Sequence, residues 1–213
     1  MTCSKSRVHP RSTGRSPYTE IVLEEEYQPR RKLPPHLRPA PEPEPDFSYE
    51  IRAAVPSDLP DIREIYNHYV RNSTVTFDEK AMTLAELRRK FEKVTKLKMP
   101  FIVAESPSGQ ILGYAYVYPW KEKAAYRFTV ENSIYLGPAS TGKGLGKVLM
   151  QELIDRSKAA GIKEIIAIIA DKGAEASIQM HKNFGFKEIG HMGRVGFKFG
   201  RWLGTVLMQK SLK

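Results

Sequence analysis

The pattern of hydrophobic and polar positions changes period several times between residues 49 and 213. Two-residue alternation and short unbroken apolar runs predict strands, whereas apolar residues spaced three and four apart predict helices. The predicted strands cover residues 49–55, 101–105, 111–120, 129–136, 163–170, 186–192 and 204–210. The predicted helices cover residues 57–70, a segment that begins after Thr83, a segment that begins near Leu145, and residues 174–183. Because strands and helices alternate through the middle of the chain, the pattern predicts an α/β or α+β domain with a mixed sheet.

Local signals place several element boundaries. Ser57 is the expected N-cap of the first helix. Thr83 and Glu86 have the spacing of a capping box, in which the two side chains satisfy free amides of the first helical turn. Residues 106–110, Ser-Pro-Ser-Gly-Gln, predict the turn of a hairpin. Three tyrosines share one face of the following strand and are interpreted as core residues: Tyr114, Tyr116 and Tyr118.

The first 48 residues differ in composition from the rest of the chain. They hold nine of the fifteen prolines, including those in the run from Pro39 to Pro45, and little hydrophobic periodicity. Such a segment cannot bury enough apolar surface to offset the entropy of the chain. We therefore predict a disordered or polyproline II tail over residues 1–48 and one folded domain over residues 49–213.

The net charge of +10 belongs almost wholly to the predicted domain. Residues 1–48 carry eight basic and seven acidic side chains, whereas residues 49–213 carry 26 basic and 17 acidic ones. A basic domain favours an anionic partner, either a polymer or a small molecule. The basic segment 87–98 predicts a helix that could contact nucleic acid, but no RNA- or DNA-binding motif accompanies it. A solvated helix face explains the same charges, so nucleic acid is kept as the alternative hypothesis.

Cysteine count and hydropathy exclude other classes of protein. Cys3 is the only cysteine, so no internal disulfide forms, and no Cys or His cluster has the spacing of a zinc site. The longest apolar run, residues 165–170, is far shorter than the roughly 20 residues needed to cross a bilayer. The N-terminus lacks the apolar stretch of a secretory signal. A disulfide-stapled scaffold and a zinc finger are therefore excluded, and we expect a cytoplasmic protein without a metal or membrane contact.

A glycine-rich segment, Gly137 to Lys147, separates a predicted strand from a predicted helix. Glycines let backbone amides approach a ligand, and a helix N-terminus carries partial positive charge, so the segment predicts an anion site. One matching motif is a Walker A loop that starts at Gly137 and ends with Gly142 and Lys143. In that motif Gly144 replaces the Ser or Thr that would hold magnesium for phosphoryl transfer. A tight turn onto the helix is the purely structural interpretation.

Seven separated stretches carry a family resemblance: residues 67–77, 118–121, 126–131, 133–136, 180–181, 185–186 and 196–198, with Trp202 following. Together they resemble the phosphinothricin and methionine sulfoximine acetyltransferase branch of the GNAT superfamily, from about Ile51 to Leu212. The resemblance implies the GNAT fold, with a mixed central sheet of about six to seven strands flanked by about four helices. It also implies acetyl-CoA as co-substrate, a small-molecule amine as acceptor and a homodimer.

The resemblance implies acetyl transfer to a primary amine. Because such an amine has a pKa around 10, it must lose a proton before it attacks a thioester. Glu131 stands where a carboxylate near the end of a central strand can accept that proton, although a solvent-facing strand position is its structural alternative. His181 matches a histidine expected to protonate the departing thiolate, and the Leu136 amide is expected to polarise the thioester carbonyl. We expect direct attack without an acetyl-enzyme, because Cys3 lies in the tail.

Cofactor contacts are implied in the same way. Ile134, Tyr135 and Leu136 are expected to lie along the pantetheine arm. The expected pyrophosphate loop comprises Thr141, Gly142, Lys143, Gly144, Leu145, Gly146 and Lys147. Two positions depart from the family pattern: Thr141 replaces a Gln or Arg, and Ala174 replaces an Asn for which Glu175 or Asp171 could compensate. These departures leave weaker acetyl-CoA binding, or a pseudoenzyme, as open alternatives.

The acceptor pocket of this branch is built from aromatic and basic side chains. The corresponding residues are Phe77, Trp120, Lys121, Lys123, Tyr126, Arg127, Phe197 and Lys198, the last two supplied across a dimer. Cationic side chains suit an acceptor with a free carboxylate or phosphinate. We therefore expect an amino-acid-like acceptor such as phosphinothricin or methionine sulfoximine, with a protein or peptide amine as the alternative.

Overall fold

The computed structural model describes residues 47–213. The tail predicted over residues 1–48 lies almost wholly outside this part and stays a prediction. Strands occupy β1 (Glu50–Ala53), β2 (Phe101–Glu105), β3 (Ile111–Pro119), β4 (Thr129–Leu136), β5 (Glu164–Ala170), β6 (Lys187–Lys198) and β7 (Arg201–Ser211). Helices occupy α1 (Leu59–Asn72), α2 (Leu84–Lys96), α3 (Leu145–Ala159) and α4 (Glu175–Asn183), and the short 3-10 turns are η2 (Pro56–Asp58), η3 (Ala124–Tyr126) and η4 (Pro138–Ser140).

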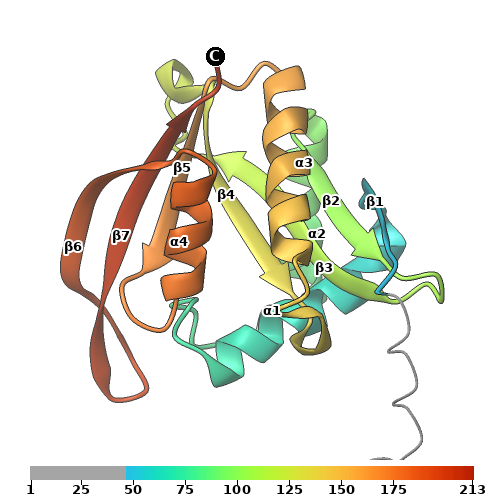
Figure 1. The fold of residues 1–213 in the computed structure, drawn as a ribbon, viewed down its shortest axis with the longest axis horizontal. Coiled ribbons are helices and arrows are strands. Elements are labelled where there is room, and N and C mark those ends of the chain that lie inside the picture. The colour runs from blue at the N-terminus through green and yellow to red at the C-terminus, as the bar shows by residue number, and fades with distance from the viewer. Residues whose placement is uncertain (1–46) are drawn as a thin grey trace, which may run out of the picture. The chain divides into compact units, whose positions relative to one another are not determined.

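The strands form one mixed sheet in the order β1-β2-β3-β4-β5-β7-β6. Neighbouring strands are antiparallel, except that β4 and β5 run parallel. In Figure 1, α3 and α4 lie in front of the sheet and α1 and α2 lie behind it. The predicted fold class, a mixed sheet of about seven strands flanked by four helices, is confirmed for residues 47–213.

A separate hydrophobic cluster packs on each face of the sheet. On one face, Leu149 and Leu153 of α3 are fully buried against Val130 of β4. On the other, Leu59 of α1 packs with the tyrosines of β3, and Tyr114 is 2% exposed. Burying one large apolar side chain contributes roughly 1.5–3 kcal/mol to the stability of the folded chain. The apolar stripes of the helices therefore pack against the sheet and form these two layers.

Strands β4 and β5 pair over only part of their length. Their parallel ladder joins Thr129 to Glu164 and ends at the pair Glu131 and Ile166. Beyond that pair, β4 continues to Leu136 while remaining bonded to β3 along its other edge. The sheet therefore splits at its centre, and one edge of β4 has no strand partner after Glu131 within the described residues.

The start of the first helix differs from the prediction. The first helix begins at Leu59, because Asp58 accepts a hydrogen bond from Val55 N (2.8 Å) and closes a 3-10 turn that contains Ser57. The capping box is confirmed, since Thr83 Oγ1 accepts from Glu86 N (3.2 Å) and Glu86 accepts from Thr83 N (2.8 Å).

The last two strands are longer than predicted and form a hairpin that continues to the pair Lys198 and Arg201. Phe199 (φ +50°) and Gly200 (φ +74°) make its two-residue turn, and positive φ at both positions is typical of such turns. Most of β6 is exposed, so it has no buried face to impose the two-residue alternation by which a strand is predicted.

Within residues 47–213, no helix combines the length and hydropathy needed to cross a membrane. The cytoplasmic location is not tested by this finding and stays a prediction.

Candidate active site

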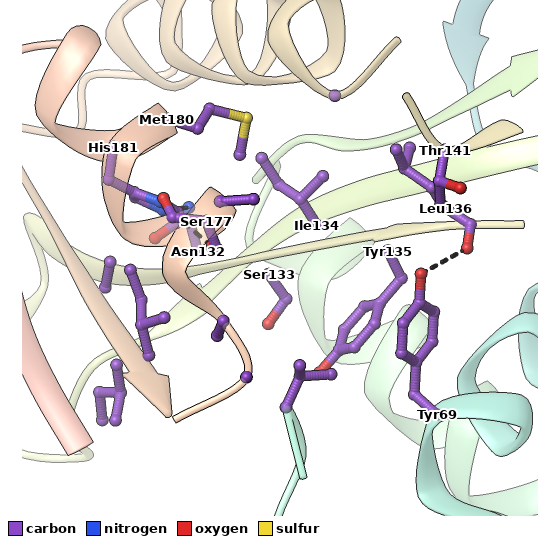
Figure 2. A pocket seen from close by; sticks show the side chains of 18 of the residues that line it. Tyr69, Asn132, Ser133, Ile134, Tyr135, Leu136, Thr141, Ser177, Met180 and His181 are labelled. Atoms are coloured by element: carbon purple, nitrogen blue, oxygen red, sulfur yellow. Dashed lines mark hydrogen bonds between the residues drawn. The ribbon is translucent and has the colours of Figure 1, made fainter. Parts of the chain in front are cut away.

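The split between β4 and β5 opens a cavity of about 500 Å³. Its walls come from α1, β4, the loop after β4, the start of α3, β5 and α4 (Figure 2). Eight of the predicted site residues line it: Glu131, Ile134, Tyr135, Leu136, Thr141, Gly142, Gly146 and His181. A cavity of this size lies within the roughly 300–1,000 Å³ typical of small-molecule and cofactor sites.

Backbone amides of β4 face this cavity along the unpaired edge. In the antiparallel ladder with β3, Trp120 N donates to Thr129 O (3.1 Å) and Gly137 N donates to Leu112 O (2.8 Å). Because hydrogen-bonded pairs recur at every second residue, the amides of Ile134 and Leu136 point the other way, toward β5, beyond the last pair between β4 and β5. They have no strand partner in the described part of the chain and can donate to a ligand.

Tyr135 and Tyr69 have other roles than the sequence indicates. The Tyr135 amide belongs to the set that bonds to β3, so this residue contributes its side chain and not a free amide to the site. Tyr69, which the sequence analysis did not select, donates its hydroxyl to Leu136 O (2.8 Å), the dashed line in Figure 2. This bond holds the end of β4 in place, and Tyr69 could have been found only from its long-range partner.

Glu131 is the last β4 residue that pairs with β5, and its half-buried carboxylate borders the cavity. Burial raises the pKa of Glu131 above its ordinary value, while the positive charges of Lys90 and Lys121 oppose that rise. Among residues 47–213 no hydrogen bond to the carboxylate adds to these effects. A carboxylate with a raised pKa is a better proton acceptor, as a general base requires.

His181 is 4% exposed and is held on both ring nitrogens. Its Nδ1 lies 2.7 Å from Ser177 O, which can only accept, so Nδ1 carries the proton. Its Nε2 lies 3.0 Å from Asn132 Nδ2 and therefore accepts from that amide. Burial lowers the pKa of His181, which favours this neutral form. The imidazole thus has no free N–H to offer a departing thiolate.

Asn132 is a residue that the sequence analysis missed. It joins β4 to α4 through His181, as Figure 2 shows at one end of the cavity, immediately after the two strands separate. Its Oδ1 is buried without a hydrogen-bond partner in the described structure. A polar residue beside Glu131 in an apolar strand was a detectable signal, but its partner lies 49 positions further along the chain.

The glycine-rich loop leads into the N-terminus of α3. Gly142 (φ +75°) and Gly144 (φ +82°) adopt left-handed backbone conformations that favour glycine. Gly144 is the N-cap and provides no side-chain cap, so the first amides of α3 remain free to bind an anion. Thr141 Oγ1 donates to Pro138 O (3.0 Å) and thus closes the loop on itself.

Three other predicted loop residues do not line the cavity with their side chains. The Leu145 side chain is fully buried in the core, so only its backbone can reach a ligand. The Lys143 ammonium lies 4.7 Å from the ring centroid of Phe47, and Lys147 N bonds to Gly144 O in the first helical turn. The carboxylates suggested as substitutes for the missing Asn are also engaged, since Glu175 accepts from Gly173 N and Asp171 accepts from Gly204 N.

Five predicted acceptor residues lie on the loop between β3 and β4, next to the strand end that carries Glu131. They are Trp120, Lys121, Lys123, Tyr126 and Arg127, and none of them lines the cavity. The Lys121 ammonium lies 4.5 Å from the Trp120 ring centroid, and Arg127 Nη1 donates to Ala124 O (3.2 Å). The loop therefore forms an exposed cationic rim rather than a pocket wall.

The structure gives Lys198 a different position from the one predicted. It is 2% exposed, and its Nζ donates to Ser73 O (2.8 Å) and Thr76 O (2.7 Å). The ammonium therefore ties the β6–β7 hairpin to the segment after α1 and is not free to bind an acceptor. Phe77 lies on the same segment, and its ring packs so closely on Gly196 that a Cβ there would come within 2.5 Å.

Phe197 does not line the cavity of this chain. It is 54% exposed on the hairpin, where its ring lies 5.4 Å from that of Trp202. Among residues 47–213, no cluster of three or more His, Cys, Asp or Glu side chains could hold a metal ion.

Comparison with known proteins defines the class. A family profile described as an acetyltransferase (GNAT) domain matches residues 51–207. The chain is 41% identical over 162 residues to a phosphinothricin N-acetyltransferase of Alcaligenes faecalis, covering 76% of this chain and 82% of that protein. It is 41% identical over 166 residues to an L-methionine sulfoximine/L-methionine sulfone acetyltransferase of Pseudomonas aeruginosa, covering 78% of this chain and 96% of that protein.

A solved structure with acetyl-CoA is similar over the same region. It is a GNAT phosphinothricin acetyltransferase from Sinorhizobium meliloti, with a TM-score of 0.73 and 42% identity, covering 77% of this chain and 88% of the other. The chain therefore belongs to the GNAT family of acetyltransferases. This membership identifies it as an acetyl-CoA-dependent N-acetyltransferase and decides against the Walker A interpretation of the glycine-rich loop.

Proposed function

We propose that this enzyme transfers an acetyl group from acetyl-CoA to the primary amine of a small amino-acid-like acceptor. The observation that carries the proposal is the split between β4 and β5, which brings outward-facing backbone amides and the Glu131 carboxylate to one cavity. Names of the relatives support the acceptor class, because they act on phosphinothricin and on methionine sulfoximine or sulfone.

The proposed reaction is a direct attack. The amine loses a proton to Glu131, directly or through one water, and its nitrogen forms a bond to the thioester carbon. Negative charge then develops on the carbonyl oxygen, which accepts a hydrogen bond from the Leu136 amide. The oxyanion then re-forms the carbonyl, the carbon–sulfur bond breaks, and the coenzyme leaves as a thiolate. The nitrogen releases its second proton as the amide forms, and this balances the proton that the thiolate takes up.

Cofactor binding follows from the same geometry. The amide of Ile134 holds the pantetheine arm along β4, and the amide of Leu136 faces the thioester. The free amides at the start of α3, together with Gly142 and Gly144, hold the pyrophosphate. The neutral His181 supports this wall through Asn132. We do not assign it the proton for the thiolate, because its one N–H is directed at Ser177 O.

We also propose that the enzyme is a homodimer. Several large apolar side chains of the β6–β7 hairpin are at least 42% exposed, which favours contact with a second copy: Ile189, Met192, Val195, Phe197, Phe199 and Trp202. Light scattering of the full chain tests this, with a monomer at micromolar concentration as the contradicting result.

A thiol-release assay with acetyl-CoA tests the acceptor class. The candidates are phosphinothricin, methionine sulfoximine, methionine sulfone and the common amino acids, each confirmed by mass spectrometry of the N-acetyl product. Turnover with one of the first three supports the proposal. Turnover only with a peptide N-terminus would replace it by the alternative acceptor class, and acetyl-CoA hydrolysis without any acetylated amine would contradict it.

A further inference from the structure

The basic segment 87–98 forms most of α2, and two of its lysines lie over the sheet. The Lys90 ammonium donates to Tyr116 Oη (3.3 Å) and lies 5.5 Å from the Tyr116 ring centroid. The Lys93 ammonium lies 4.8 Å from the ring centroid of Tyr118. Part of the charge that the sequence associates with nucleic acid is therefore directed at the sheet.

The register of β3 and β4 relates these lysines to the catalytic residue. Tyr116 pairs with Ser133, and Tyr118 pairs with Glu131. Residues that pair directly in an antiparallel ladder project from the same face of the sheet. Lys90 therefore lies over the face that carries Glu131, at the level of Ser133, whereas Lys121 approaches from the strand end beyond the pair Pro119 and Val130.

Lys90 and Lys121 share a second property: neither forms an ion pair with a carboxylate of residues 47–213. Both nevertheless act on the Glu131 carboxylate through space. Lys90 is half-buried, and buried charges are usually paired because desolvation is costly. One carboxylate with an ammonium group on either side is complementary to an amine that carries two anionic groups.

We propose that Lys90 is a specificity-determining residue that binds the distal anionic group of the acceptor. The acceptor class is then an α-amino acid whose side chain ends in an anion such as a phosphinate. Its amine faces Glu131 and its α-carboxylate faces the Lys121 rim. This inference rests on the proposed function and narrows its substrate class.

Two isosteric acceptors isolate the effect of one charge. Phosphinothricin and methionine sulfone have the same chain length and terminal methyl group, but only the former has an anionic end group. In Lys90→Met we expect the ratio of kcat/KM for phosphinothricin to that for methionine sulfone to fall about tenfold, the size expected for one charge-assisted hydrogen bond. Any change in the basicity of Glu131 alters both substrates alike and cancels in this ratio.

Matched variants define the controls. Lys90→Arg keeps the charge and should keep the ratio within about threefold of the wild type. Lys96→Met removes a charge from an exposed position of the same helix and should change neither substrate. Thermal melting shows that each variant is folded.

The outcomes separate the two proposals. Wild-type enzyme that acetylates neither compound, nor any other amino acid, overturns the proposed function and this inference with it. Acetylation of methionine sulfone together with an unchanged ratio in Lys90→Met overturns the role of Lys90 alone. An equal loss for both substrates also overturns it, because Lys90 would then act on the α-carboxylate or on Glu131.

Discussion

Replacing Glu131 by glutamine keeps the shape of the side chain and removes the proton acceptor. An amine with a pKa around 10 is unprotonated in roughly one molecule in a thousand at pH 7, and a site without a base depends on that fraction. We therefore expect kcat/KM for the acceptor to fall about 1,000-fold at pH 7, within the range typical of general-base catalysis. The deficit should shrink about tenfold for each pH unit toward the amine pKa.

The wild-type enzyme should show the matching pH dependence. A general base must be deprotonated, so activity should fall as the pH drops through the pKa of Glu131, which burial places above the ordinary value of 4.5. Glu131→Gln should lose this acidic limb.

Thiol release from acetyl-CoA, measured from about pH 4.5 to pH 9, gives both profiles. Glu122→Gln is the control, because it removes a carboxylate from the exposed loop between β3 and β4. The KM for acetyl-CoA should stay within about twofold in both variants, since the expected cofactor contacts are backbone amides. Turnover by Glu131→Gln close to that of the wild type, or a deficit independent of pH, would refute the assignment of the base.

Three further predictions concern the walls of the site. Asn132→Ala removes the donor to His181 Nε2. We expect a several-fold rise in the KM for acetyl-CoA and an unchanged pH profile of activity. Loss of the alkaline limb of that profile would instead mark His181 as an acid. Lys198→Met leaves the carbonyls of Ser73 and Thr76 without their donor, which should lower the free energy of unfolding by about 1–3 kcal/mol in urea titrations; no change would show that the tether contributes nothing. Gly196→Ala places a Cβ 2.5 Å from the Phe77 ring and should lower kcat/KM for the acceptor, whereas Gly193→Ala, with nothing within 4 Å, should not; equal effects would contradict the steric argument.

We also predict that the protein is less stable at low pH. Burial keeps the pKa of His181 below its ordinary value of 6.5, so the unfolded chain takes up a proton there that the folded chain resists. Stability should therefore decline as the pH falls below 6.5, and this decline should be smaller in His181→Gln.

Sequence alone predicts the features that repeat locally. The spacing of Leu145, Val148, Leu149 and Leu153 predicts α3 because a helix buries one stripe. The three leucines are fully buried, whereas Val148 lies at the edge of the stripe and is 40% exposed. Glu131 is different, because a carboxylate in an apolar strand also fits a solvent-facing position, and only the family resemblance implies its role as the base.

Features that depend on distant partners are not predictable in this way. Lys198 is assigned to the acceptor pocket by the family resemblance, yet two carbonyls more than 120 positions earlier in the chain hold it in the interior. The hydrogen bond between Asn132 and His181 likewise forms only because α4 packs beside β4 in the folded chain. The local sequence does not distinguish Lys90 from a surface lysine. Only the register of β3 and β4 relates it to Glu131.

The interrupted pairing of β4 and β5 also links the stability of this enzyme to metabolism. In the proposed binding mode the pantetheine arm, which has amides of its own, lies in the gap as a short additional strand of the sheet. A ligand that binds only the folded chain stabilises it by about 2.7 kcal/mol at a hundredfold excess over Kd. Resistance to heat and to proteolysis should therefore rise and fall with the supply of acetyl-CoA, so that the amount of intact enzyme follows the supply of its own substrate.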